Sequence, residues 1–205
     1  MSATIHPIPY AEKARLRADL VAMGRKARAA QRALALMTPQ AKADALRAAA
    51  TAIRVSMPLI LESNAADVSA ARESGQNDAF IDRLLLNPQR IEAIAKSVED
   101  IADLSDPVGE VTSEWTRPNG MKISRVRTPL GVIGVIFESR PNVAADAGAL
   151  CFKAGNAVIL RTGSGALRSA VELCKAMQAG LISKKVPEGA IQLVPVPDRE
   201  AVGLM

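Results

Sequence analysis

The chain has 205 residues, of which 49% are hydrophobic, 23% charged and only 2% aromatic. This length fits one large domain or two small ones, and the apolar fraction is sufficient for a core, which excludes a disordered chain. The sequence contains neither an apolar run of about 18 residues nor the apolar stretch of a secretion signal. It therefore predicts a cytoplasmic protein with reduced cysteines and no membrane span.

The charge and the single histidine exclude further classes. The net charge of +5 can attract anionic ligands, but it is too small and too dispersed to predict nucleic-acid binding. A Ser-His-Asp triad would have to use His6. A zinc site would need His6 to converge with Cys151 and Cys174, and no Cys-x-x-Cys or His-Glu-x-x-His spacing is present. Neither a triad nor a metal site is expected.

Residues 10–104 are predicted to form a layer of successive helices, because apolar residues recur there at the helical spacing. Thr38 and Asn87 each precede a proline, which is typical of an N-cap followed by the first helical residue. Asp78 is expected to cap a short helix, and Gly75 to end a longer one. The predicted helices begin at Ala11, Pro39, Pro58, Phe80 and Pro88.

A basic cluster lies within the first predicted helix. It consists of Arg25, Lys26, Arg28 and Arg32. We interpret it as a solvated helix face, because no aromatic residues are interleaved with it for base stacking; an anion-binding patch is the alternative.

Residues 108–128 are predicted to form a β-hairpin. Apolar and polar residues alternate on both sides of Asn119-Gly120, and this dipeptide favours a two-residue turn in which both residues have positive φ. A lone hairpin is marginally stable, so it must pack on its own domain or against another chain.

Residues 129–205 have the pattern strand, helix, strand, helix, strand, which predicts a doubly wound parallel α/β sheet. The first strand, Leu130–Phe137, is an uninterrupted apolar run of the kind buried on both faces. The remaining elements are helices at 142–153 and 165–182, strands at 156–160 and 190–194, and a final helix capped by Asp198.

Ligands bind at the carboxyl ends of the strands in such sheets, which directs attention to the turns at 138–142, 161–165 and 195–199. The first turn lacks a Gly-x-Gly-x-x-Gly fingerprint, and no Gly-x-x-x-x-Gly-Lys phosphate loop is present. In the second turn, Gly163, Ser164 and Gly165 precede a helix and follow Arg161, an arrangement that suits an anion. An ordinary glycine-rich turn explains the same residues equally well.

Two stretches of this segment resemble a known family. One runs from Pro129 to Val143 and includes Glu-Ser-Arg-Pro-Asn at 138–142; the other runs from Asp146 to Arg161 and continues into Gly163-Ser164. They resemble the gamma-glutamyl phosphate reductases, or glutamate-5-semialdehyde dehydrogenases, of the aldehyde dehydrogenase superfamily. The similarity extends along the whole chain and implies N-terminal helices with a Rossmann-like sheet that is incomplete at its C-terminus.

The resemblance implies an NADPH-dependent reduction of L-glutamyl 5-phosphate to the semialdehyde, with release of phosphate, in proline biosynthesis. In that family a cysteine attacks the acyl phosphate, and the resulting thioester is reduced by hydride. Asn142 matches the oxyanion-stabilising asparagine. The match also assigns a set of cofactor-binding residues: Phe137, Glu138, Arg161, Thr162, Gly163 and Ser164. Among these residues, Arg161 is expected to favour NADPH by contacting its 2′-phosphate.

The hairpin at residues 108–128 resembles the oligomerisation flap of the superfamily. A homo-oligomer is therefore expected.

The sequence departs from the family in two respects. Thr162 and Gly165 stand where the family commonly has glycine and glutamate in Gly-Gly-Ser-Glu. The catalytic cysteine belongs to a later domain, and Cys151 and Cys174 are expected to be unreactive residues buried on helices. The chain is thus expected to be inactive alone. Another NAD(P)-dependent member of the superfamily, or a non-catalytic nucleotide-binding module, remains an alternative.

Overall fold

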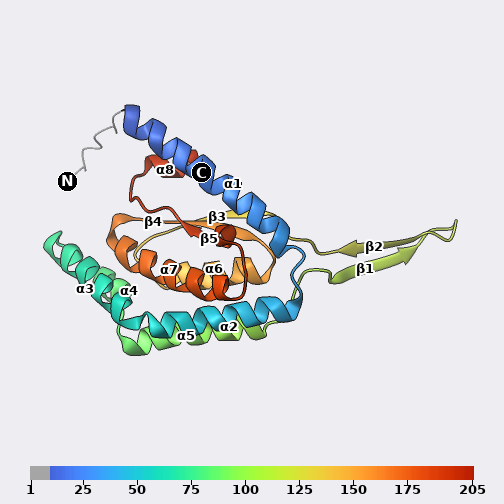
Figure 1. Cartoon of the computed structure of the whole chain (residues 1–205), viewed down its shortest axis with the longest axis horizontal. Coiled ribbons are helices and arrows are strands. Elements are labelled where there is room, and N and C mark those ends of the chain that lie inside the picture. Colours follow the sequence, from blue (N-terminus) through green and yellow to red (C-terminus); the bar gives the residue numbers. More distant parts are fainter. Residues whose placement is uncertain (1–9) are drawn as a thin grey trace.

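The structure, a computed structural model, describes residues 10–205 as stacked layers of helices and a small parallel sheet from which one hairpin projects (Figure 1). His6 lies outside the described residues. The helices are α1 (Tyr10–Leu34), α2 (Pro39–Val55), α3 (Met57–Glu73), α4 (Asp78–Leu84), α5 (Pro88–Asp103), α6 (Val143–Lys153), α7 (Leu167–Ser183) and α8 (Glu200–Leu204). The strands are β1 (Val111–Thr116), β2 (Lys122–Val126), β3 (Val132–Phe137), β4 (Ala157–Thr162) and β5 (Ile191–Leu193). Short 3₁₀ turns, Ser164–Ala166 and Glu188–Ala190, precede α7 and β5.

The helix boundaries follow local capping signals. Thr38 Oγ1 accepts a hydrogen bond from Ala41 N at 3.2 Å, and Asn87 Oδ1 accepts one from Arg90 N at 2.8 Å, so both predicted N-caps are confirmed. The cap predicted at Asp78 is wrong. Asn77 caps α4 by accepting a hydrogen bond from Phe80 N at 2.9 Å, and Asp78 lies in the first turn, where its charge suits the helix dipole.

The parallel sheet has the strand order β3-β4-β5. All six residues of the central strand β4 are buried, as expected for a strand covered on both faces. The same expectation is wrong for β3, in which Ile136 is 51% exposed, and for the preceding Leu130, which is 87% exposed. Among the described residues, β3 pairs only with β4, so it forms an edge of the sheet.

The helices cover the two faces of the sheet in separate layers (Figure 1). Helices α6 and α7 lie on one face, and α2 and α5 pack behind them. Helix α1 crosses the opposite face next to α8, so the helices predicted as one layer divide between the two sides of the sheet. Arg25, Lys26, Arg28 and Arg32 are exposed on α1, in agreement with the solvated face. In the described part of the chain, no helix is both long and apolar enough to cross a membrane.

Close contact between helices explains why the core is rich in alanine and poor in aromatic residues. A Cβ atom added at Gly180 of α7 would lie 2.4 Å from the Ala49 Cα atom of α2. The facing positions Ala45, Leu46, Ala49 and Ile53 have no exposed surface. Small residues therefore allow the two backbones to touch, and the aliphatic side chains fill the space on either side.

The hairpin extends away from the body, and all of β1 is exposed (Figure 1). Its turn differs from the prediction, because the loop is Pro118-Asn119-Gly120, closed by Arg117 N donating to Met121 O and Gly120 N donating to Arg117 O, both at 2.9 Å. Only Gly120 of this loop has positive φ, +84°. Pro118 fixes its own φ near −65°, which favours a type I turn followed by a left-handed glycine.

Candidate functional site

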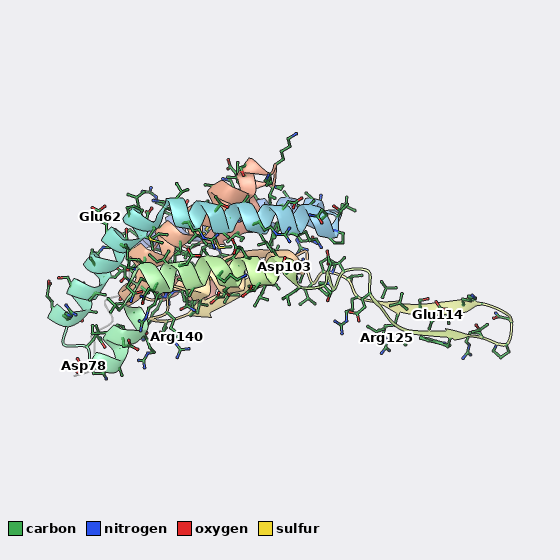
Figure 2. The ribbon with its side chains drawn as sticks, turned by 90° about the horizontal axis from the view of Figure 1, so that it is seen from below. Glu62, Asp78, Asp103, Glu114, Arg125 and Arg140 are labelled. Carbon is green, nitrogen blue, oxygen red and sulfur yellow. The ribbon has the colours of Figure 1, made fainter. Side chains whose placement is uncertain are left out.

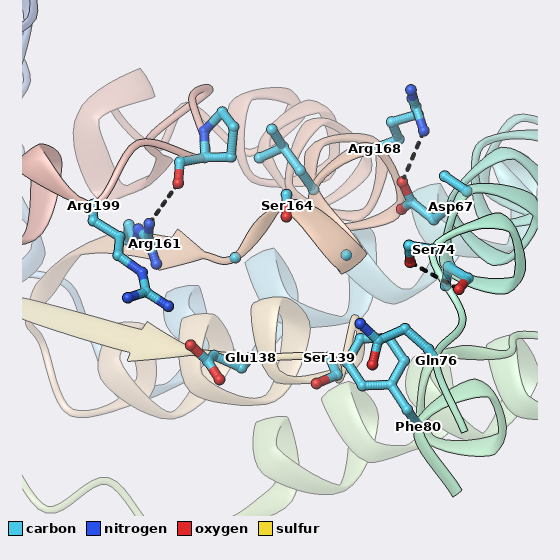
Figure 3. A pocket seen from close by; sticks show the side chains of 16 residues that line it. Asp67, Ser74, Gln76, Phe80, Glu138, Ser139, Arg161, Ser164, Arg168 and Arg199 are labelled. Atoms are coloured by element: carbon cyan, nitrogen blue, oxygen red, sulfur yellow. Dashed lines mark hydrogen bonds and ion pairs between the residues drawn. The ribbon is translucent and has the colours of Figure 1, made fainter. Parts of the chain in front are cut away.

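The turns predicted to hold a ligand meet at the carboxyl ends of the parallel strands. They form one wall of an open pocket of about 650 Å³, and α3 and α4 form the other (Figure 3). We call it the strand-end pocket. The turns contribute Glu138, Ser139, Arg161, Gly163, Ser164, Gly165, Pro197 and Arg199, and the opposite wall includes Asp67, Ser74, Gln76 and Phe80. Its location is the usual ligand site of an open parallel sheet.

Arg161 lies at the end of β4 and is only 3% exposed. Its Nη2 donates a hydrogen bond to the carbonyl oxygen of Pro197 at 2.7 Å, which fixes the turn after β5. Arg199, two residues along this turn, is exposed, and its side chain is directed toward Glu138 in Figure 3. Arg161 therefore supports the pocket wall, whereas Arg199 presents its charge to the interior.

Asp67 of α3 caps α7 from outside that helix. Its Oδ2 accepts hydrogen bonds from Ser169 N at 2.8 Å and from Ser169 Oγ at 2.7 Å, and its side chain is fully buried. Arg168 lies close to the other carboxylate oxygen, at 3.5 Å. The sequence analysis missed Asp67, although Asn64 and Asp67 interrupt the buried face of α3 at a spacing of three residues. Because a carboxylate already occupies this helix terminus, an anion here depends on the exposed guanidinium groups of Arg168 and Arg199.

Buried polar atoms without a hydrogen-bond partner gather around this pocket. Within residues 10–205 they are Asp67 Oδ1, Arg161 Nε and Thr162 Oγ1. Asp67 and Arg161 line the pocket, and Thr162 follows Arg161. Since buried polar groups are almost always paired, the unpaired atoms of Asp67 and Arg161 indicate that the pocket suits a polar ligand. Thr162 is fully buried and Phe137 is 9% exposed, and neither lines the pocket.

Gly165 has a steric explanation. A Cβ atom at this position would lie 2.9 Å from Cζ of Phe80, so the aromatic ring of α4 occupies the space that a side chain would need. The ring of Phe80 thus fills the space next to Gly165, where the family commonly has glutamate, and it closes that end of the strand-end pocket.

Asn142 lies in a different pocket, of about 430 Å³, which we call the Asn142 pocket. It is bordered by α4, α5 and the start of α6. Asn142 Nδ2 donates to Asp146 Oδ2 at 2.9 Å, and Ser97 Oγ donates to Asp146 Oδ1 at 3.0 Å. A carboxylate can only accept, so Asp146 fixes the amide with its nitrogen inward, and a second N–H remains for a ligand. The side chain of Asn142 makes no capping hydrogen bond to α6, which argues against a purely capping role.

Neither cysteine has the properties of a nucleophile. Burial raises the pKa of the Cys174 thiol to about 12 and also raises the pKa of Cys151, so both remain protonated at neutral pH. Cys174 is buried as expected, whereas the full burial expected for Cys151 is wrong, because that residue is only half-buried. Neither residue lines the strand-end pocket or the Asn142 pocket. In the described part of the chain, no group of histidine, cysteine and acidic side chains could hold a metal ion.

Comparison with known proteins agrees with this architecture. Residues 4–205 match the aldehyde dehydrogenase family. The chain belongs to that family. It is 57% identical over 183 residues to the gamma-glutamyl phosphate reductase of Brucella suis, covering 89% of this chain and 44% of the relative. The corresponding protein of Rhodospirillum rubrum is 56% identical over 186 residues, covering 91% and 44%. This chain thus spans less than half the length of these curated relatives.

Solved structures give the same result. The gamma-glutamyl phosphate reductase of Thermotoga maritima superposes with a TM-score of 0.86 at 39% identity, covering 89% of this chain and 44% of that one. The enzyme of Saccharomyces cerevisiae gives 0.79 at 32% identity, covering 86% and 46%. A probable aldehyde dehydrogenase of Listeria monocytogenes, at 19% identity and a TM-score of 0.69, covers 94% and 40% and shares the fold. The expected α/β class and the resemblance to the reductases are confirmed.

Proposed function

We propose that this chain contributes the cofactor-binding part of an NADPH-dependent gamma-glutamyl phosphate reductase. The observation that carries the proposal is the 55–57% identity to curated relatives of that name. The proposed reaction converts L-glutamyl 5-phosphate, NADPH and a proton into L-glutamate 5-semialdehyde, NADP⁺ and phosphate, as a cytoplasmic step of proline biosynthesis.

The strand-end pocket is the proposed cofactor site. NADPH, when bound, supplies the hydride. Gly163 and Ser164 allow close approach to the backbone, and Glu138 lies opposite them. Arg161 holds the Pro197 turn, and Arg199 provides exposed positive charge for the 2′-phosphate. Phe137 and Thr162, which do not line the pocket, position the strand ends from which these residues extend.

The Asn142 pocket is the proposed place of reaction. The amide N–H of Asn142 that is not bonded to Asp146 donates to the oxygen on which negative charge develops when a thiolate attacks the acyl carbon. Asp146 and Ser97 keep the amide in the orientation that this requires. The thiolate comes from a cysteine elsewhere in the whole enzyme, since Cys151 and Cys174 are helix-packing residues.

The reverse reaction of the full-length protein tests this function. L-glutamate 5-semialdehyde, inorganic phosphate and NADP⁺ are supplied, and NADPH is followed by its absorbance. We expect turnover that requires phosphate, with a lower KM for NADP⁺ than for NAD⁺. Turnover of simple aldehydes without phosphate would instead identify another member of the superfamily, and cofactor binding without turnover would indicate a non-catalytic module.

We also propose that the full-length protein is a homo-oligomer joined through the hairpin. Every residue of β1 is exposed, and Trp115 retains 43% exposure, which is unfavourable for a strand pair without a partner surface. Light scattering at micromolar concentration is expected to give a dimer or larger species, and Trp115→Lys is expected to reduce the mass. A monomer mass for the unaltered protein would refute the proposal.

A further inference from the structure

The Asn142 pocket has an excess of positive charge that its own acidic residues do not neutralise. Arginines from α4, α5 and the β3–α6 turn line it together with two aspartates: Arg83, Arg90 and Arg140 with Asp82 and Asp146. The two acidic groups already have partners inside the chain. Arg90 Nη2 lies 2.6 Å from Asp82 Oδ1, and Asp146 accepts hydrogen bonds from Asn142 and Ser97.

Two guanidinium groups therefore remain for a ligand. Arg83 and Arg140 are exposed, and neither forms an ion pair with any residue in the range 10–205. Figure 2 shows Arg140 on the side of the body that α4 and α5 border. Arginine stays charged at all physiological pH values, and its planar fork matches the oxygens of a phosphate group.

The backbone of the β3–α6 turn determines which pocket each side chain enters. Ser139 has φ +52°, a left-handed conformation that is uncommon for a residue other than glycine and that recurs at functional sites. On one side of this bend, Glu138 and Ser139 line the strand-end pocket; on the other, Arg140 and Asn142 line the Asn142 pocket. The bend thus places a cation two residues from the proposed oxyanion donor.

We propose that Arg140 binds the phosphoryl group of the acyl phosphate substrate, an inference that rests on the proposed function. In the acylation step the thiolate sulfur bonds to the acyl carbon, and the carbon–oxygen bond to phosphate breaks, with the electron pair leaving on phosphate. Arg140 stabilises that departing charge while Asn142 donates to the acyl oxygen. The phosphoryl group is attached to the reacting carbon, whereas the substrate's α-carboxylate lies at the far end of the molecule. A cation two residues from Asn142 is therefore assigned to the phosphate.

The reverse reaction separates these anionic groups, because inorganic phosphate and the semialdehyde are then independent substrates. For Arg140→Ala in the full-length protein, we expect the KM for phosphate to rise about 10–100-fold, the effect of losing one charge-assisted contact. The KM for NADP⁺ is expected to stay unchanged, and Arg140→Lys to give an intermediate value. The matched control is Arg72→Ala, which removes one positive charge from the exposed surface of α3, outside both pockets.

A rise in the KM for semialdehyde alone would show that Arg140 binds the carboxylate, and it would overturn the proposal. Unchanged KM values for phosphate and for semialdehyde in a normally folded Arg140→Ala variant would also overturn the proposal. If the unaltered protein fails to turn over, the proposed function fails, and binding of inorganic phosphate is then measured by calorimetry. Weaker binding to Arg140→Ala than to Arg72→Ala still supports the phosphate site, and equal binding overturns it.

Discussion

The two pockets on either side of the β3–α6 turn are built in different ways. Two charged groups of the strand-end pocket, Arg161 and Asp67, are buried and bonded within the fold: Arg161 donates to Pro197, and Asp67 caps α7. In the Asn142 pocket no charged residue is buried: Arg83 and Arg140 are exposed, and Arg90 and Asp146, which are bonded to Asp82 and Asn142, are half-buried. A rigid site suits a ligand whose position must be fixed, such as a cofactor. The more open site suits a substrate that arrives together with residues from outside this chain.

The largest expected effect is on kcat, and it distinguishes the Asn142 pocket from the strand-end pocket. Asn142→Ala in the full-length enzyme is expected to lower kcat by about 10²–10³-fold, the usual loss for one oxyanion donor. The KM for NADPH is expected to change little, because the lost hydrogen bond belongs to the transition state and to the other pocket. Steady-state kinetics with both substrates measure the two constants.

Ser97→Ala is the matched control, because it removes one donor to Asp146 and leaves the Asn142 amide in place. Its kcat is expected to fall much less than that of Asn142→Ala. If Asn142→Ala instead lowers only the melting temperature and keeps a near-normal kcat, the residue is structural and the division between the pockets fails.

A smaller effect separates Arg161 from Arg199 in the strand-end pocket. Arg199→Ala is expected to raise the KM for NADPH about 10–100-fold and to leave that for NADH almost unaffected, because we propose that the exposed guanidinium contacts the 2′-phosphate, which NADH lacks. Arg161→Ala is expected to weaken both cofactors equally, since Arg161 fixes the Pro197 turn. A loss confined to NADPH in Arg161→Ala would instead support the prediction from the sequence that Arg161 contacts the 2′-phosphate.

The smallest expected effect is on stability. Asp67→Ala removes the cap of α7 and leaves the amide of Ser169 buried without its acceptor, which is expected to lower the free energy of unfolding by about 1–3 kcal/mol. Asp67→Asn keeps an acceptor oxygen and is expected to lose less. Urea unfolding of both variants measures the difference, and equal losses would mean that side-chain charge, rather than the hydrogen bond, stabilises this helix end.

Local signals in the sequence predicted the elements, whereas long-range contacts decided the site. Thr38 and Asn87 are followed by proline, so their caps could be predicted from neighbouring residues. The hydrogen bond by which Asp67 caps α7 joins residues that are 102 positions apart, so no local sequence motif predicts it. Likewise, the apolar composition of β3 predicted burial but not the number of neighbouring strands. Asn119-Gly120 predicted a turn, whereas Pro118 determined its length.

The backbone contact at Gly180 limits how this molecule can change during evolution or engineering. Because a methyl group there would meet Ala49 at 2.4 Å, α7 and α2 cannot be reinforced by larger side chains at this crossing. Any enlargement would displace α7, and with it the helix end that Asp67 secures beside the proposed cofactor. Gains in thermal tolerance are therefore to be sought on the outer surfaces of α1 and α5, where substitutions leave the spacing between helices intact.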